Sequence, residues 1–354
     1  MRQTATHSFF FLGGCYNRGI AMRQIIFFGI SLIAGSAVFF WVLGHIGWKE
    51  VWDAFFAAFD AKRAGSLLGL TMLMLFVGMW RWRVILQSYQ EHIGIVQMSK
   101  IYLAGFALLY IFPMIPLLAE SFRGSLLRSH HQIPFSRGVA SVLSERILEV
   151  TMSLAVVLVG GAIVLFHWRQ PSVPFGGIVL GGMVCGLVII FLFLYVRMFQ
   201  SKSIVGMFVR QASSGNGKNA VEEVEAEIFR FFSWNNPYFW KALALSIIRM
   251  GVGLARTFLL VIFLAGGTNV SAALGISGSY YLSTFFPVPA GIGFHESFQA
   301  FTFQVFGFTS VMGAAFALAL RAVETLVVVC GLLFVLWFGF DFLHRVIVPR
   351  KSRE

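Results

Sequence analysis

Charged residues are scarce in this sequence of 354 residues. Only 12% of them are Asp, Glu, Lys or Arg, about half the share found in soluble globular domains. Hydrophobic residues make up 58% of the chain, and 40 residues are phenylalanine. This balance excludes a water-soluble fold, and the long unbroken apolar runs exclude a transmembrane β-barrel, whose strands are short and alternating. The sequence therefore predicts an all-α polytopic membrane protein.

Cysteine and acidic residues are also few. Cys15, Cys185 and Cys330 are scattered, and two of them lie inside apolar runs, so no disulfide framework or metal site is expected. The 27 Lys and Arg outnumber the 15 Asp and Glu and give a net charge of +12. These basic residues crowd the short segments between apolar runs, where they orient a membrane protein, and they form no nucleic-acid-binding domain. We expect no metal, no cofactor and no nucleic-acid partner.

Eight apolar segments are long enough to enter the membrane. They lie at residues 25–43, 64–84, 101–119, 139–166, 175–197, 239–264, 270–287 and 310–340. The basic residues between them, including Arg81 near the end of the second segment, mark the cytoplasmic side by the positive-inside rule. Both termini are then cytoplasmic, and we expect the protein in the cytoplasmic (inner) membrane. The loops expected outside are 44–63, 167–174 and 265–269.

Prolines interrupt two of the eight segments. Pro113 and Pro116 lie within the segment 101–119, and the basic residues that follow it belong in the cytoplasm. We expect this segment to form a re-entrant hairpin that enters from the cytoplasm and returns to it. The region 270–308 has the same design, with its turn at Pro287–Gly293, and enters from outside. Such broken backbone persists at membrane depth only when it is buried in protein or lines a wet cavity.

Several features recur at one nearly constant offset, about 175 residues, which indicates an internal duplication. The pairs are Gly78 and Gly253, Arg81 and Arg256, Pro113 and Pro287, Glu120 and Glu296, Arg146 and Arg321, and Glu149 and Glu324. The predicted topology runs 139–166 outward and its counterpart 310–340 inward, so the two halves form an inverted repeat. Inverted repeats with broken helices are an architecture that secondary transporters use.

The repeat divides the chain into five parts. They are a tail outside the fold at 1–22, a first membrane repeat at 23–197, a cytoplasmic linker at 198–238 with an amphipathic helix at 221–232, the remainder of the second repeat at 239–342, and a basic cytoplasmic tail at 343–354. The second repeat begins at about residue 175.

Ionised side chains in the apolar segments are the sharpest chemical signal, because each costs on the order of 2.5–3.5 kcal/mol at the centre of a membrane helix. The candidate substrate-binding and translocation residues are Glu120, Arg123, Glu145, Arg146, Glu149, Arg249, Arg256, Pro287, Pro289, Gly291, Gly293, Glu296, Arg321 and Glu324. Buried salt bridges that fix helix register would explain each Arg-x-x-Glu pair equally well. The carboxylates after the proline turns favour a site, since intramembrane carboxylates can exchange protons and guanidinium groups bind phosphate. We therefore expect a site for an anionic headgroup, coupled to protons.

Other motifs give weaker indications of function. The pair His130-His131 has no Cys or carboxylate at ligand spacing, and His295-Glu296 lacks the second His of a zinc-protease helix. No set of nucleophile, base and orienting group is visible.

Four strings carry a resemblance to a known family. They are Glu120-Ser-Phe-Arg123, Ser144-Glu-Arg-Ile-Leu-Glu149, Pro287-Val-Pro-Ala-Gly-Ile-Gly-Phe-His-Glu296 and Arg321-Ala-Val-Glu324. Over residues 23–342 the chain resembles the lysylphosphatidylglycerol synthase transmembrane-region family, whose best-known member joins a lipid flippase to an aminoacyl-lipid synthase. It departs from the family at 116–119, where Pro-Leu-Leu-Ala replaces a small, Gly-rich turn.

The resemblance implies a flippase module without the fused synthase domain, because the chain ends soon after its last apolar segment. We predict a lipid flippase or transporter that moves a phospholipid or a polyprenyl-linked anionic headgroup between leaflets, in preference to an enzyme. Two alternatives stay open: an integral-membrane transferase acting on lipid-linked substrates, and a scaffold for a lipid-synthesis enzyme. Membrane lipids with anionic headgroups are the expected partners.

Overall fold

The computed structural model describes residues 18–58, 60–113, 118–168, 176–199, 217–267, 269–286 and 288–347. These residues are helical and contain no strand, as the sequence predicts. The helices are α2 (Arg18–Ile46), α3 (Trp48–Ala58), α4 (Ala61–Ser88), α5 (Ile95–Ile111), α6 (Leu118–His131), α7 (Phe135–His167), α8 (Gly176–Phe199), α10 (Gly217–Phe231), α11 (Pro237–Ala265), α12 (Val270–Thr284), the 3₁₀ turn η1 (Pro289–Gly291), α13 (Phe294–Val305) and α14 (Ser310–Ile347).

Five helices are long and apolar enough to cross a membrane. The stretches that qualify are Ile26–Ile46, Ala61–Ser88, Phe135–His167, Pro237–Ala265 and Ser310–Asp341. Each overlaps a segment predicted from hydropathy. Shorter apolar stretches occur at Ile95–Ile111 and Gly181–Phe193. The fold is therefore that of a multi-pass membrane protein.

Side-chain caps define where several helices begin. The Asp60 carboxylate accepts a hydrogen bond from the Arg63 backbone N–H at 2.8 Å and starts α4. Asn236 caps α11 in the same way, with Pro237 at the first helical position, where its missing N–H costs nothing. Asp60 and Asn236 are separated by the repeat offset to within one position, so α4 and α11 begin at corresponding positions.

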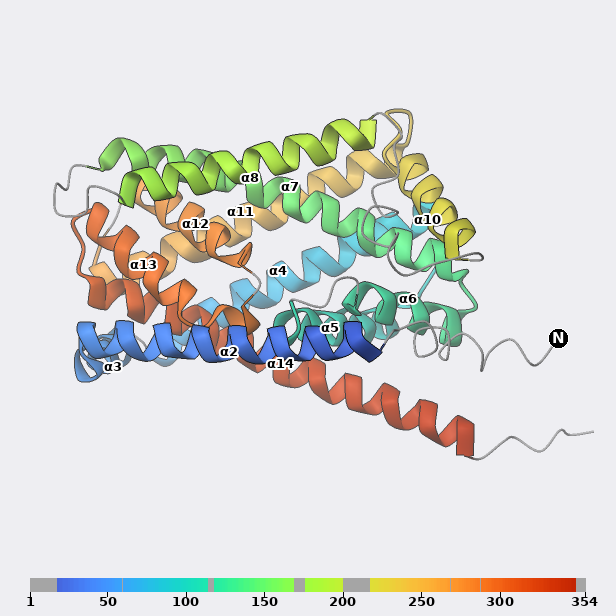
Figure 1. The fold of residues 1–354 in the computed structure, drawn as a ribbon, viewed down its shortest axis with the longest axis horizontal. Helices are drawn as coiled ribbons and strands as arrows, with labels where there is room; N and C mark the ends of the chain where they lie inside the picture. The colour runs from blue at the N-terminus through green and yellow to red at the C-terminus, as the bar shows by residue number, and fades with distance from the viewer. Residues whose placement is uncertain are drawn as a thin grey trace, which may run out of the picture.

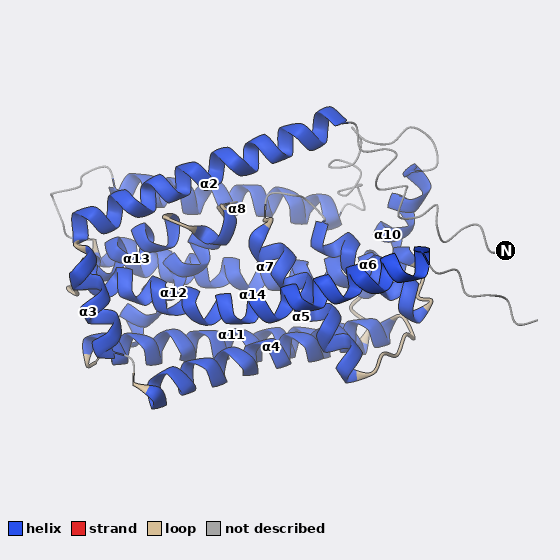
Figure 2. Ribbon diagram, turned by 90° about the horizontal axis from the view of Figure 1, so that it is seen from below, coloured by secondary structure: helices blue, strands red, loops and turns tan. Residues whose placement is uncertain are grey.

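Two pairs of short helices occupy opposite ends of the bundle. Helices α5 and α6 pack against each other at one end, and α12 and α13 at the other, in both views (Figures 1 and 2). The breaks fall where the prolines predict: α5 ends at Ile111 before Pro113, and α12 ends before η1. Residues 114–117, with Pro116, and Pro287 lie outside the described residues.

The two halves make matching contacts across their central helices, α4 and α11. Arg81 donates to the Ser246 hydroxyl at 3.3 Å, and Arg256 donates to the Thr71 hydroxyl at 3.2 Å. The repeat offset relates Arg81 to Arg256, and the same offset relates Thr71 to Ser246. The second bond therefore repeats the first with the halves exchanged, and the two helices run antiparallel.

The packing of the other helices repeats in the same way, with equivalent helices of the two halves exchanged. Helix α7 packs on α12, as α14 packs on α5. Helix α6 packs on α7, as α13 packs on α14. The amphipathic helix α10, predicted at 221–232, packs on α7, and α3 packs on α14 at the opposite end (Figure 1). Helix α3 corrects the sequence analysis, which treated 44–63 as a loop, because Trp48–Ala58 is helical. The helix is amphipathic and too short to span a membrane, so a search for long apolar runs does not find it.

Glycines allow the closest of these helix contacts. A Cβ on Gly160 of α7 would lie 2.5 Å from the Leu274 carbonyl oxygen and 2.7 Å from Gly278 Cα of α12. Gly331 of α14 lies similarly close to the Leu103 backbone of α5. Small residues at helix crossings let backbones approach in membrane proteins, where van der Waals packing drives association.

Substituting Gly160 with Ala should therefore destabilise the protein by about 1–3 kcal/mol, since backbone blocks the added methyl. Gly182→Ala on α8 is the matched control, because nothing lies within 4 Å of its Cβ position. Thermal unfolding in detergent should show a lower midpoint for the first variant only. Equal midpoints would contradict the packing of α7 on α12.

Candidate functional site

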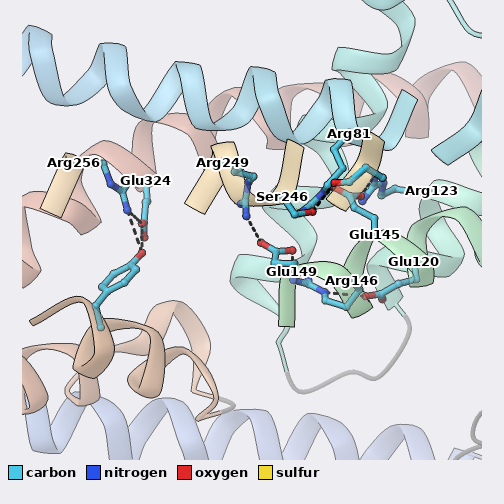
Figure 3. Close-up of polar contacts among 12 residues, drawn as sticks. Arg81, Glu120, Arg123, Glu145, Arg146, Glu149, Ser246, Arg249, Arg256 and Glu324 are labelled. Carbon is cyan, nitrogen blue, oxygen red and sulfur yellow. Dashed lines mark hydrogen bonds and ion pairs between the residues drawn. The ribbon is translucent and has the colours of Figure 1, made fainter. Parts of the chain in front are cut away.

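Glu145 lies at the centre of a buried triad. Its two carboxylate oxygens accept hydrogen bonds from Arg81 Nη2 at 3.0 Å and from Arg123 Nη2 at 2.8 Å (Figure 3). The Arg81 and Glu145 side chains are 1% and 3% exposed. The Arg123 guanidinium also stacks over the Trp82 ring, 3.8 Å from its centroid. The triad thereby joins α6, the second helix of the α5–α6 pair, to α4 and α7.

A second chain of charges begins at Glu120, in the first turn of α6. Arg146 lies 3.7 Å from Glu120 and 2.9 Å from Glu149, and Arg249 of α11 lies 3.0 Å from Glu149 (Figure 3). Together with the triad, these residues form what we call the first cluster: Arg81, Glu120, Arg123, Glu145, Arg146, Glu149 and Arg249.

The second cluster lies at the α12–α13 pair. Tyr280 donates to Glu324 at 2.6 Å, and Arg256 lies 3.5 Å from the same oxygen (Figure 3). Arg321 pairs with Glu296 through both of its terminal nitrogens, at 3.2 Å for Nη2 to Oε2. The second cluster is Arg256, Glu296, Arg321 and Glu324. Among the described residues, no salt bridge joins the two clusters, so the predicted charges form two groups.

The glycine-rich turn places Glu296. Gly291 and Gly293 have φ angles of 63° and 82°, in the left-handed region that favours glycine. Gly293 donates its N–H to Glu296 Oε2 at 2.9 Å, so this carboxylate also caps α13. A Cβ on Gly293 would meet the backbone of Gly35, so α2 lies directly on the turn. Pro289 is buried beside it.

His295 is held by a serine. Ser283 donates its hydroxyl to the Tyr280 carbonyl at 2.6 Å, and His295 Nδ1 lies 2.6 Å from the same hydroxyl oxygen. The Ser283 hydroxyl thus bridges the Tyr280 carbonyl and the imidazole ring of His295. The ring stacks on Tyr280 with 5.3 Å between centroids.

A small cavity of about 60 Å³ opens beside the first cluster. It is lined by Tyr102, Gly105, Phe106, Leu109, Ala119, Glu120, Arg123, Val142, Glu145, Arg146, Glu149 and Arg249. Such a volume admits a few water molecules among polar partners.

The structure brings together most residues singled out from the sequence. Six lie in the first cluster and four in the second, while Pro289, Gly291 and Gly293 form the turn before Glu296. Arg81 requires a correction, because it is buried against Glu145 and is no flanking charge in contact with the cytoplasm. Arg256, one repeat offset after Arg81, was already a candidate. The offset alone therefore indicated that Arg81 was a candidate as well. Tyr280 was missed, and nothing in its spacing marked it.

Replacing Glu145 with Leu should cost about 3–5 kcal/mol, because it leaves the buried Arg81 and Arg123 without their shared carboxylate. Adding Arg123→Gln should recover part of the loss, since Leu320 and Gln299 stand at the corresponding places in the second half. Unfolding midpoints of the single and double variants test this. A double variant less stable than the single one would contradict the triad.

Residues 26–331 match the model of one protein family, described as the lysylphosphatidylglycerol synthase TM region. No curated protein and no solved structure matches the chain. The matched range contains both short helix pairs and every member of the two clusters, and it confirms the resemblance seen in the sequence. The chain belongs to the lysylphosphatidylglycerol synthase TM-region family, a membrane family tied to lipid metabolism.

Proposed function

We propose that this protein is a lipid flippase or related transporter that moves an anionic headgroup between the leaflets of the cytoplasmic membrane, coupled to protons. The observation that carries this proposal is a duplicated ion pair. Glu120 and Glu296 each lie in the first turn of the second helix of a short helix pair, and each pairs with the equivalent arginine, Arg146 or Arg321. A salt bridge that only stabilises the fold can occur at one end of the bundle alone. A transporter that opens to both sides of the membrane needs an equivalent ion pair at each end.

Helix lengths support re-entrant hairpins. Helices α5, α6, α12 and α13 have 17, 14, 15 and 12 residues, so none reaches more than about 26 Å, short of the roughly 30 Å hydrocarbon core. Each pair enters and leaves at one end of the bundle, and the two pairs use opposite ends (Figure 1). With α2, α4, α7, α8, α11 and α14 as the crossing helices, this gives eight membrane segments with both termini in the cytoplasm.

The paired hydrogen bonds of Arg81 and Arg256 support an inverted repeat. Two helices that run antiparallel and exchange equivalent contacts are related by a two-fold axis perpendicular to them. For helices that cross the bilayer, this axis lies in the membrane plane. The proposed function uses this relation, since exchanging the conformations of the halves turns an inward-facing protein into an outward-facing one.

In the proposed mechanism, an arginine exchanges its glutamate partner for the phosphate of the lipid. Protonation of Glu296 removes its charge, releases Arg321 and weakens the cap on α13, which frees the second hairpin to move. The released guanidinium can then bind the headgroup phosphate, while the acyl chains stay in lipid. Glu120 and Arg146 do the same at the other hairpin, beside the cavity.

Glu296→Gln should abolish leaflet exchange of fluorescent or spin-labelled phospholipid in proteoliposomes, because the amide keeps the shape but holds no ionisable proton. Glu120→Gln should do the same. The matched control is Glu222→Gln on the exposed face of α10, which should retain exchange.

Unchanged exchange in a folded Glu296→Gln variant would remove this carboxylate from the mechanism. Mass spectrometry of the lipids before and after incubation provides the second readout. Translocation leaves every lipid mass unchanged, whereas a product of changed mass would replace the transporter by a membrane transferase.

A further inference from the structure

Helix α3 presents three different faces. One face packs on the bundle, because Val51 is 1% exposed and belongs to a buried cluster with Leu43 of α2 and Ala314 of α14. A second face carries the exposed charged residues Lys49, Glu50 and Asp53. A third face, which we call the aromatic face, carries the exposed residues Trp48, Trp52 and Phe56. These three are spaced four apart, so they lie along one side of the helix.

The aromatic face continues a surface that α2 exposes to lipid. Phe40 and Trp41 of α2 are 60% and 64% exposed, and they lie in a stretch that is apolar enough to cross the membrane. The centroid of the Trp48 ring lies 5.8 Å from that of the Phe40 ring. The exposed side chains of a membrane-spanning helix contact lipid, and the aromatic face of α3 adjoins them directly.

The length of α2 sets the depth of α3. The stretch Ile26–Ile46 has 21 residues and reaches about 30 Å as an α-helix, which is the thickness of the hydrocarbon core. A single residue, Gly47, separates α2 from α3, and its φ angle of 102° turns the chain. Helix α3 lies at the end of the bundle where α2 finishes (Figure 2). It therefore lies at the level of the membrane interface, where tryptophan is enriched.

Helix α10 shows that packing on the bundle does not require an aromatic face. It precedes α11 as α3 precedes α4, and it packs on α7 as α3 packs on α14. Its packed face is apolar, with Val224 and Ile228 buried. Within 222–231, however, the exposed residues are Glu222, Glu223, Ala226 and Arg230. The exposed aromatic rings of α3 thus need an explanation other than helix packing.

We infer that α3 binds the lipid bilayer at the boundary between headgroups and acyl chains, with its aromatic face inserted and its charged face in water. Under the proposed topology this is the outer leaflet. One lysine and two acidic residues give the helix a charge of 1 − 2 = −1. Attraction to anionic lipids therefore cannot supply the contact, and insertion of apolar rings does. This surface goes beyond the proposed function and does not depend on leaflet exchange.

Spin labels on single cysteines test the contact. Trp52→Cys places a label on the aromatic face, and Asp53→Cys places one on the charged face of the same helix. Glu222→Cys on α10 is the second control, and all three are made in a background lacking Cys15, Cys185 and Cys330. In proteoliposomes, the access of oxygen, which concentrates in lipid, is compared with that of a water-soluble nickel chelate. The oxygen-to-nickel ratio should be severalfold higher at 52 than at 53 or 222.

Phe56→Cys is a second variant on the aromatic face that keeps both tryptophans, so the test does not depend on the folding of one variant. Nickel access at 52 and 56 equal to that at 53 would place the aromatic face in water and overturn the inference. Exclusion of both reagents at 52 and 56 would show that protein covers this face, such as a second copy of the chain, and would overturn it as well.

Lipid composition tests the chemistry of the contact. The ratio at 52 should be the same in phosphatidylcholine vesicles with and without phosphatidylglycerol, and at low and high salt, because the helix has no positive net charge. A ratio that rises with phosphatidylglycerol or falls with added salt would show an electrostatic contact with anionic headgroups and overturn the apolar assignment. None of these arms measures transport, so failure of the proposed function would leave their outcome unchanged.

Discussion

An ionised side chain inside an apolar helix bundle needs a counterion or water, and this constraint organises the protein. Eleven arginines and glutamates of the bundle meet it by gathering in two clusters, each between one short helix pair and the long helices around it. The Arg81–Glu145–Arg123 triad is the most deeply buried example, and it fixes α6 against α4 and α7. The ion pairs therefore connect the short helices to the long helices around them.

The two halves of the chain share some contacts and differ in others. The contacts that recur, such as Arg81 with Ser246 and Arg256 with Thr71, support the proposal of two related conformational units around a shared axis. Other contacts do not recur, and they make the two clusters different. The first cluster contains the Arg81–Glu145–Arg123 triad and adjoins the cavity, whereas the second cluster adjoins a glycine turn covered by α2.

Much of the fold follows from the sequence, because hydrophobic run length and proline position act locally. The long helices lie within a few residues of the predicted segments, and the breaks near Pro113 and Pro289 fall as expected. Which side chains pair with one another depends on the rotation and crossing angle of the helices that carry them. The spacing of residues along the chain does not determine these two quantities. For that reason Glu145 was a candidate without its partner Arg81, and the hydrogen bond from Tyr280 to Glu324 had no signal.

The central claim is that the two hairpins enter from opposite faces of the membrane. Ser129 and Gln304 test it most directly, because they are exposed near the far ends of α6 and α13. Single cysteines there, in a background lacking Cys15, Cys185 and Cys330, are treated in intact cells with an impermeant thiol reagent. The account predicts labelling of the cysteine at 304, and labelling at 129 only after permeabilisation. Labelling of both positions from the same side would contradict it.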